Sequence, residues 1–394
     1  MRLAPKKLLR HLRRRLAKAR ARRRPPLVEP VRTGIIGCGV ISQRYLETAA
    51  YFNLLDVVAC ADTCSEAAQK RARSHGIPLA CTVEELLGDP SIELVINLTP
   101  PTAHFEISAA ALGAGKSVYS EKPLAIARQD ACALLAQAES AGLRIGCAPD
   151  TVLGGGLQTC RKLVDEGAIG IPVGAVAVCA SRSPEIWHPD PAGFFQPGGG
   201  PLLDMAPYYL TALVHFMGPI RRISGIAGTS PLERIIARGP RAGEGIEVGT
   251  PTLVMALLEF ANGAYGNLTV TYDFAGASGR GIQLYGTEGT LQTPDPNGFD
   301  GPVRLFRRDT VAWRTIPLTH GYTMNFRGLG AADMAFAMRT GRPHRANAQI
   351  AYHVVDVMQA ILETAETGAS RDIESSCERP APMPPGLEPG ALGP

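Results

Sequence analysis

Residues 31–42 read Val-Arg-Thr-Gly-Ile-Ile-Gly-Cys-Gly-Val-Ile-Ser, and this stretch decides the fold. Its apolar first half predicts a short buried strand that ends at Gly37, and residues 42–52 have helical character. In such a strand–turn–helix, Gly37 allows the tight turn. Gly39 lets the backbone approach a pyrophosphate, which then rests at the helix N-terminus. Ser42 replaces the third glycine of the usual pattern and is small enough for close helix–strand packing.

An acidic residue ends the second predicted strand, which covers residues 57–61. Asp62 follows the glycines at about the 20-residue spacing at which a carboxylate accepts hydrogen bonds from the adenosine ribose hydroxyls. Its charge would repel a 2′-phosphate, so the sequence predicts NAD as the cofactor and disfavours NADP. The alternative is a glycine turn followed by an acid that has no role in binding.

Alternating elements continue to about residue 150. Further strands are predicted at 94–98, 117–119 and 143–147, and helices at 65–75, 102–114 and 127–141. Strands that alternate with helices predict a parallel, doubly wound sheet. We therefore assign residues 31–150 to an N-terminal Rossmann domain in an α/β protein.

The pattern changes in residues 151–368. Strands are predicted near 173–181, 251–260, 264–272, 281–285 and 303–307, and helices at 157–167, 328–340 and 347–367. Asn262-Gly263 stands between two of these strands and is a strong hairpin signal. Neighbouring hairpins predict a separate C-terminal α+β domain with an open, mainly antiparallel sheet.

Both ends of the chain differ from this body. Residues 1–24 carry twelve Lys or Arg and no acid, whereas the rest has 28 basic and 36 acidic residues. Nucleic-acid binding by the folded body is therefore not expected. For the basic arm, residues 1–30, three interpretations compete: a disordered solubilising segment, a segment that binds anionic membrane or nucleic acid, and a wrongly chosen start codon. Residues 369–394 are rich in Pro and Gly and are predicted to form a disordered tail.

The nine cysteines are scattered and include no CxxC pair. A disulfide framework or structural zinc site would need paired spacings, so we predict free thiols in a cytoplasmic protein. No His, Asp and Glu cluster has metal-ligand spacing, and no metal is predicted. No apolar run is long enough for a membrane span, and no signal peptide is expected.

Ser120-Glu121-Lys122-Pro123 follows the predicted strand at 117–119. A lysine at the carboxyl end of a parallel strand faces the ligand crevice, where Lys122 could hold a substrate hydroxyl and exchange its proton. Beside a cationic nicotinamide and partly desolvated, we expect its pKa to be lowered. The alternative is an ordinary surface lysine.

A glycine-rich segment, residues 197–209, reads PGGGPLLDMAPYY. Asp204 is expected to cap a helix with Pro207 in its first turn, and Asp204 and Tyr208 would then share a helix face. A carboxylate and a phenol that point the same way suit a sugar diol or a proton relay. The alternative is a capped helix with tyrosines in the core. His188, on a preceding loop, is expected either to close over substrate or only to pack.

Several motifs in the same order are similar to those of the Gfo/Idh/MocA family, named after glucose–fructose oxidoreductase and inositol dehydrogenase. The resemblance covers residues 31–368 and is carried by GIIGCGVIS, NLTPPTAH at 97–104, the EKP triplet, GGGPLLDMAPYYLTAL, IQLYGTEGTLQTPDP at 282–296 and RGLGAADMAFAMRTGRPHRA at 327–346. It implies a Rossmann domain, a second sheet domain, and a sugar or polyol between them. It also implies that the Lys122–Pro123 bond is often cis and that symmetric dimers or tetramers are usual.

Site roles follow from these observations together. We expect the cofactor to be bound by Gly37, Gly39, Val40, Ile41, Asp62 and Glu121, and the resemblance implies that Thr99, Pro100 and His104 lie on the nicotinamide side of the cofactor site. Lys122, Asp204 and Tyr208 are the expected catalytic residues, and with His188 they are expected to bind substrate. Many family members carry a histidine four residues after the aspartate, whereas this chain has Tyr208. Tyrosine can still donate a proton, but the substitution leaves the usual acid–base assignment open.

The predicted activity is NAD-dependent hydride transfer between nicotinamide and a secondary hydroxyl or ketone of a sugar, polyol or nucleotide sugar. Two alternatives stay open at this point. One is an enzyme that uses bound NAD transiently to cleave or dehydrate sugars without net redox change. The other is a non-catalytic, nucleotide-sensing protein on the same fold.

Overall fold

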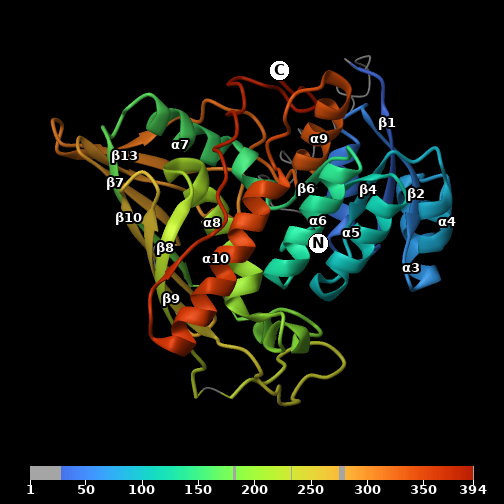
Figure 1. Ribbon diagram of the computed structural model, residues 1–394, viewed down its shortest axis with the longest axis horizontal. Helices are drawn as coiled ribbons and strands as arrows, with labels where there is room; N and C mark the ends of the chain where they lie inside the picture. The colour runs from blue at the N-terminus through green and yellow to red at the C-terminus, as the bar shows by residue number, and fades with distance from the viewer. Residues whose placement is uncertain (1–27, 181–182, 232, 275–279, 394) are drawn as a thin grey trace, which may run out of the picture.

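The computed structural model describes residues 28–180, 183–231, 233–274 and 280–393. The basic arm therefore lies almost entirely outside the described residues. Two sheets stand at opposite sides of the molecule, with long helices between them (Figure 1). This arrangement confirms the predicted fold class of a parallel Rossmann sheet followed by a mainly antiparallel sheet.

The first sheet has six parallel strands in the order β3-β2-β1-β4-β5-β6. Its strands are β1 (Val31–Ile36), β2 (Leu55–Ala61), β3 (Leu79–Cys81), β4 (Leu94–Asn97), β5 (Ser117–Ser120) and β6 (Ile145–Cys147). Its helices are α2 (Ser42–Ala49), α3 (Ser65–His75), α4 (Val83–Gly88), α5 (His104–Gly113) and α6 (Arg128–Ser140). The central strands β4 and β5 are buried along their whole length, as expected for a sheet with helices on both faces.

The second sheet has nine strands in the order β14-β13-β12-β11-β7-β10-β9-β8-β15. They are β7 (Pro172–Ala180), β8 (Ile220–Gly228), β9 (Leu253–Phe260), β10 (Tyr265–Thr271), β11 (Gly281–Gly286), β12 (Gly289–Gln292), β13 (Val303–Arg307), β14 (Ala312–Ile316) and β15 (Arg371–Asp372). Only the β7–β10 pair is parallel among these described strands. The predicted Asn262-Gly263 turn joins β9 to β10, with Gly263 at φ +85°.

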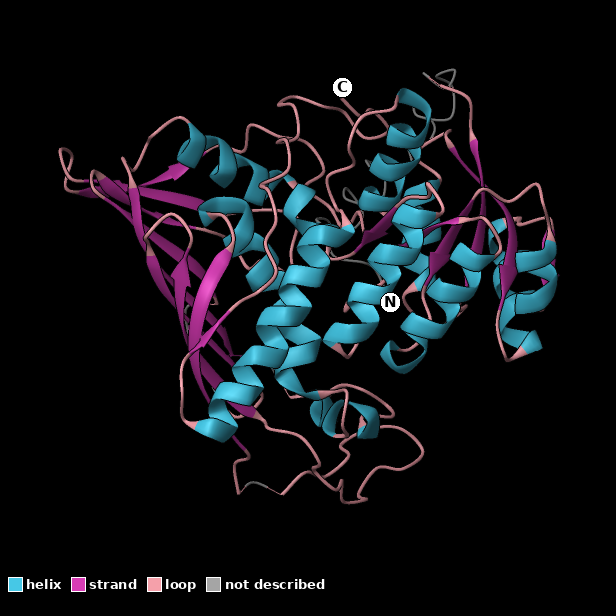
Figure 2. Ribbon diagram, in the orientation of Figure 1, coloured by secondary structure: helices cyan, strands magenta, loops and turns pink. Residues whose placement is uncertain are grey.

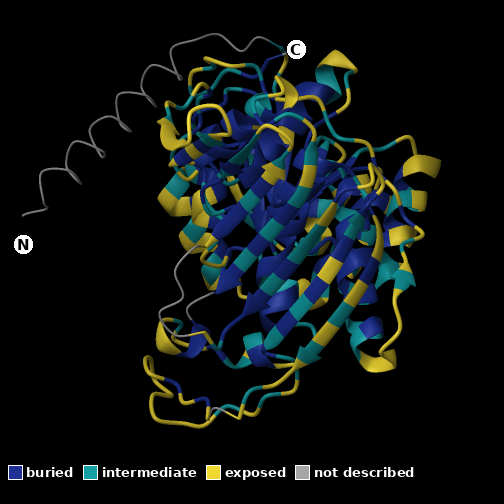
Figure 3. Ribbon diagram, turned by 90° about the vertical axis from the view of Figure 1, so that its left-hand side faces the viewer, coloured by how far each residue is buried: buried dark blue, intermediate teal, exposed yellow. Residues whose placement is uncertain are grey.

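Helices α7 (Gly155–Asp165), α8 (Gly200–Met217) and α10 (Ala348–Thr367) cover one face of this sheet (Figure 2). The other face is open and shows bands of partly exposed residues along the strands (Figure 3). Helix α9 (Leu329–Thr340) belongs to the second half of the chain but packs on α2, β5 and β6. The two domains are thus contiguous in sequence but interleaved in space, and Asp150 Oδ2 accepts hydrogen bonds from the amides of Gly328 and Gly330.

The expected start of α8 is wrong. The helix begins at Gly200, its N-cap is Gly199, and Asp204 lies inside it. Pro201 occupies the first turn, where a missing amide hydrogen costs no helical hydrogen bond, whereas Pro207 is internal. The misassignment arose because two prolines compete as helix-start signals. The expected one-turn separation of Asp204 and Tyr208 on α8 is confirmed.

The prediction of a disordered tail at 369–394 is also wrong for its described part. Strand β15 pairs with β8, and the Met383 amide donates to the Gln158 side chain at 2.7 Å. Cys377, Met383 and Leu392 are buried, so scattered apolar side chains outweigh a Pro- and Gly-rich composition.

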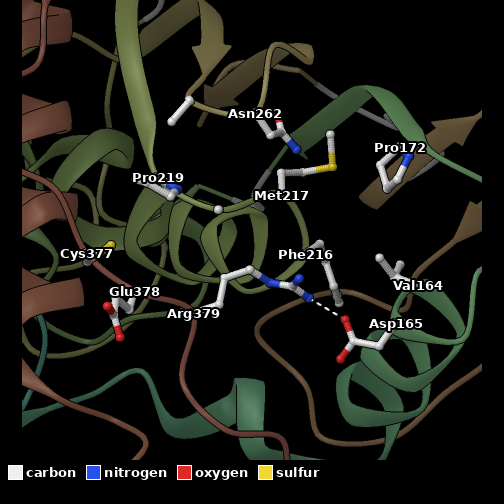
Figure 4. Close-up of a pocket in the computed structure, with 12 residues that line it drawn as sticks. Val164, Asp165, Pro172, Phe216, Met217, Pro219, Asn262, Cys377, Glu378 and Arg379 are labelled. Atoms are coloured by element: carbon white, nitrogen blue, oxygen red, sulfur yellow. Dashed lines mark hydrogen bonds and ion pairs between the residues drawn. The ribbon is translucent and has the colours of Figure 1, made fainter.

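This segment also forms one wall of a cavity of about 640 Å³ at the C-terminal end of α8 (Figure 4). Arg379 of this segment and Asp165 of α7 both line the cavity and form an ion pair of 2.6 Å.

Candidate active site

The loop between β1 and α2 has the geometry of a phosphate cradle. Gly37 has φ +99°, and a Cβ placed there would lie 2.5 Å from the backbone of Leu98, so only glycine fits. A Cβ at Gly39 would meet nothing within 4 Å, which leaves open space beside the loop. Val40 is 89% exposed, and Ser42 is fully buried.

Asp62 holds this loop from the end of β2. Its two carboxylate oxygens accept hydrogen bonds from the amides of Cys38 (2.7 Å) and Cys64 (2.8 Å). Arg71 on α3, which the sequence did not single out, donates to the carbonyl oxygens of Cys38 and Gly39. The carbonyls are therefore turned toward α3, while each Asp62 oxygen keeps acceptor capacity for a ribose hydroxyl.

Lys122 lies two residues beyond β5 and reaches across to α8. Its ammonium donates to Asp204 Oδ1 at 2.8 Å and to the Asp204 carbonyl oxygen at 2.6 Å. The second Asp204 oxygen accepts from the Tyr272 hydroxyl at 3.0 Å. Both side chains are largely buried, with 14% and 23% exposure for lysine and aspartate. The Lys122–Pro123 peptide is cis, as the resemblance implies.

The expected lowering of the Lys122 pKa is not found in this structure. Burial lowers the pKa of Lys122, but the neighbouring Asp204, Tyr208 and Glu121 raise it further, and the net shift is upward. The reason is the direct ion pair with Asp204, a contact that sequence spacing did not reveal. The lysine is thus held protonated in this state.

Tyr208 completes the group one turn along α8 from Asp204. The Lys122 ammonium lies 5.3 Å from the centre of its ring, and the Arg327 guanidinium carbon lies 5.8 Å from it. Burial raises the pKa of Tyr208, while the charges of Lys122 and Arg327 oppose this rise. The structure therefore brings Lys122, Asp204 and Tyr208 together, and it adds Tyr272 and Arg327.

Two models of known families match this chain. One describes an oxidoreductase family with an NAD-binding Rossmann fold and matches residues 31–148, and the other describes the GFO/IDH/MocA C-terminal domain and matches residues 157–292. The chain belongs to the Gfo/Idh/MocA family. It is accordingly an NAD-binding oxidoreductase, and its two sheet domains correspond to the two parts of the family architecture.

Relatives in the Gfo/Idh/MocA family include 1,5-anhydro-D-fructose reductase of Ensifer adhaerens, 30% identical over 66% of this chain and 74% of that protein. Trans-1,2-dihydrobenzene-1,2-diol dehydrogenase of Bos taurus is 28% identical over 78% of this chain and 87% of that protein. Among solved structures, levoglucosan dehydrogenase in complex with NADH and levoglucosan aligns with a TM-score of 0.76 at 24% identity. That alignment covers 88% of this chain and all of the other, and it shows the common fold.

The glycine loop of this family member fits a dinucleotide on structural grounds. A side chain at Gly37 would clash with the neighbouring backbone, whereas the space beside Gly39 is open. The N-terminus of α2, with its free amide groups, follows the same loop. Glu121 stands nearby: it accepts from the Tyr45 hydroxyl at 2.8 Å and from the Lys122 amide at 3.0 Å. These contacts fix the start of the EKP triplet.

The segment at 99–104 divides into exposed and buried residues. Pro100 is exposed and Thr99 is half-buried, with its hydroxyl bound to Asn97 at 2.7 Å. His104 is fully buried, and its ring nitrogens lie 2.6 Å from the Pro123 carbonyl and 2.8 Å from the Thr99 carbonyl. Burial lowers the pKa of His104, against the effect of these two carbonyls. His104 thus connects the 99–104 segment to the residue that follows Lys122.

His188 lies on the loop after the short 3-10 helix Pro184–Ile186. Its ring packs on Trp187 and Phe194, and its Nδ1 accepts from the Asp190 amide at 3.1 Å. None of the contacts found for His188 within the described residues reaches Lys122, Asp204 or Tyr208. The loop itself approaches the first domain, because a Cβ at Gly198 would lie 2.9 Å from the Ile126 side chain.

Proposed function

We propose that this oxidoreductase transfers a hydride between nicotinamide and a secondary hydroxyl, or the corresponding ketone, of a sugar or polyol. The observation that carries the proposal is the Lys122–Asp204 ion pair, with Tyr208 against the same ammonium. The group follows β5, whose carboxyl end opens on the same crevice as the glycine loop. Relatives named as a sugar reductase and a levoglucosan dehydrogenase support this class of substrate.

Each residue of the site has a distinct proposed role. Lys122 holds the reacting hydroxyl oxygen with its ammonium group, and Tyr208, coupled to Lys122, accepts the hydroxyl proton in its basic form. Asp204 orients the ammonium and balances its charge. NAD, when bound, accepts the hydride at its nicotinamide ring.

Cofactor binding is assigned to the segments that follow four strands, β1, β2, β4 and β5. The backbone of Gly37, Gly39, Val40 and Ile41 would receive the pyrophosphate, and Asp62 the adenosine ribose. The segment with Thr99 and Pro100, together with Glu121, would flank the nicotinamide half. For His104 we propose a positioning role, because both its nitrogens face backbone carbonyls. His188 is proposed as part of a loop over the substrate.

The test is to identify the nucleotide released from denatured protein and then to follow NADH formation with a panel of sugars and polyols. Steady NAD reduction by one panel member is the expected result. Bound NAD that is neither reduced nor released during conversion of a sugar would contradict net hydride transfer and indicate a non-redox reaction. Bound NAD without any conversion of any panel member would indicate the sensing alternative. The relatives, which are named dehydrogenases and reductases, favour neither of these.

We also propose a homodimer or homotetramer that associates through the open face of the second sheet. Ile226, Leu257 and Tyr265 lie on this face and are each more than 60% exposed, with 67%, 66% and 63% of their surface accessible. An apolar patch of this kind favours burial against a second copy. Mass measurement in solution tests it, and replacing Leu257 with Glu should dissociate the assembly.

A cytoplasmic location is proposed from the cysteines. All nine are free, which suits a reducing compartment. None of the helices in the described parts of the chain combines the length and apolar character that a bilayer crossing requires. Fractionation of cells that make the tagged protein tests the assignment.

A further inference from the structure

Arg327 brings a second positive charge to the Tyr208 ring. It precedes α9, far from both Lys122 and Tyr208 in sequence, yet its guanidinium carbon lies 5.8 Å from the centre of the tyrosine ring. The Lys122 ammonium lies 5.3 Å from the same centre. A phenol in contact with two cations is in an unusual electrostatic environment, since a single cation–π contact already contributes measurably.

Neutral oxygens hold the guanidinium in place. Its Nη2 donates to the Asn297 carbonyl at 3.1 Å and also to the side-chain oxygen of Asn297. Its Nη1 donates to the Asn325 side chain at 3.1 Å. Amide oxygens satisfy hydrogen bonds without cancelling the charge.

Arg327 is half-buried, and its neutral partners distinguish it from the buried Arg234 and Arg345. Arg234 pairs with Glu185 and Asp273, and Arg345 pairs with Asp333. Within the described ranges of the chain, no carboxylate lies within 4.0 Å of Arg327. A partly desolvated guanidinium without a carboxylate partner exerts a stronger electrostatic effect on a neighbouring side chain.

We propose that Arg327 is a positioning residue that acts through Tyr208: it fixes the phenol beside Lys122 and stabilises negative charge on the phenol oxygen during proton transfer. The inference rests on the proposed function. It explains how a tyrosine serves where many family members carry histidine. In the oxidation direction the substrate O–H bond breaks, and its proton goes to the phenolate form of Tyr208, which becomes the neutral phenol, while Lys122 stays protonated. The hydride from the adjacent carbon goes to nicotinamide, and the oxygen's electron pair forms the new C=O bond.

The other charged groups around the phenol act against Arg327. Asp204 and Glu121 raise the pKa of Tyr208, whereas Lys122 and Arg327 lower it. Asp150 also interacts electrostatically with Arg327, and burial raises the pKa of Asp150 to about 6. Removal of the guanidinium would leave the carboxylates balanced by Lys122 alone, so the basic form of Tyr208 becomes harder to reach.

The test compares Arg327→Met and Arg327→Lys in the full chain with NAD. For Arg327→Met we expect kcat for oxidation at neutral pH to fall about tenfold to a hundredfold. The rising limb of its pH profile should move up by about one pH unit. Arg327→Lys should recover part of both. Asn297→Ala, which removes one of the three hydrogen bonds that the guanidinium donates but keeps the charge, should shift the profile less and serves as a second variant if Arg327→Met fails to fold.

Two outcomes would overturn the proposal. One is a rise in KM with an unchanged pH profile, which would make Arg327 a substrate-binding residue. The other is an equally large loss when Arg327→Met is added to Tyr208→Phe, because a residue that acts through Tyr208 should add little once the phenol is gone. Tyrosinate ultraviolet absorbance gives a readout without substrate. The component lost in Tyr208→Phe should titrate at higher pH in Arg327→Met, whether or not the sugar activity is found.

Discussion

The Lys122 ammonium lies 2.8 Å from Asp204 Oδ1, and the two residues come from different domains. Lys122 follows β5 of the Rossmann sheet, whereas Asp204 lies on α8 of the second domain. A direct ion pair between them fixes the ammonium at the boundary between the two domains. The site therefore depends on domain packing as much as on either motif.

Replacing Lys122 with Met should lower turnover by about a hundredfold to ten-thousandfold, because it removes both the hydroxyl contact and a proton-transfer group. NAD affinity should stay unchanged, since the glycine loop and Asp62 are untouched. Steady-state rates and calorimetric NAD titration measure the two effects. Wild-type turnover in this variant would exclude the proposed role, and equal loss of NAD binding would indicate a folding defect.

Replacing Asp204 with Asn should lower the pKa of Lys122, because the carboxylate is the largest influence that raises it. Ketone reduction needs Lys122 and Tyr208 in their protonated forms. The activity should therefore fall as the pH rises through the pKa of Lys122. That fall should therefore begin at lower pH in Asp204→Asn. Tyr272→Phe is the matched control: it removes one hydrogen bond to Asp204 but keeps the charge. A similar shift in both variants would contradict the electrostatic explanation.

The sequence predicted five of the six Rossmann strands, because buried parallel strands are apolar and end at Gly, Pro or acidic residues, and it missed the short, partly exposed edge strand β3. Strand β8 (Ile220–Gly228) was missed since only one of its faces is buried and its other face carries Arg and Ser. The edge strand β14 was missed because its residues are mostly exposed. Helix α9 was predicted, but its packing on the first sheet was not. Hydrophobic periodicity does not indicate that the chain crosses back from the second domain to the first.

Some residues of the candidate site could likewise be predicted from the sequence, and others could not. Lys122, Asp204 and Tyr208 could be identified because each lies in a short motif with local meaning. Tyr272 and Arg327 could not, although Arg327 opens the segment at 327–346 that carries the family resemblance. Their part in the site arises only from contacts between elements distant in sequence, and an arginine or tyrosine alone has no distinctive spacing.

Replacing the two glycines of the β1–α2 loop with Ala should affect different properties of the protein. At Gly37 the added Cβ meets the backbone of Leu98 at 2.5 Å, and φ is +99°. Gly37→Ala should therefore lower the free energy of unfolding by about 1–3 kcal/mol. At Gly39 the Cβ meets no protein atom, so Gly39→Ala should keep stability and lose NAD affinity. Thermal melts with and without NAD separate the two effects, and an equal loss of stability in both would be inconsistent with this geometry.

Cofactor preference should depend on Asp62. Asp62→Ser removes the charge that opposes a 2′-phosphate, so the NAD-to-NADP affinity ratio should fall by about tenfold or more. NAD affinity itself should also drop, because Asp62 orients the loop through the Cys38 and Cys64 amides. The exposed Asp56 on β2 provides a control, and Asp56→Ser should change neither. Titration with both nucleotides measures the ratio, and an unchanged ratio would remove Asp62 from the ribose site.

The C-terminal segment should contribute to stability despite its composition. Met383 is 2% exposed, and its amide is bound to Gln158 on α7, so Met383→Ala would leave a cavity against the second domain. A loss of about 2–4 kcal/mol in the free energy of unfolding is expected. Glu378→Ala, at an exposed position five residues earlier on the same segment, should change stability little. Urea unfolding of the two variants measures the difference. Equal stability of Met383→Ala and wild type would mean that the segment does not pack on the body in solution.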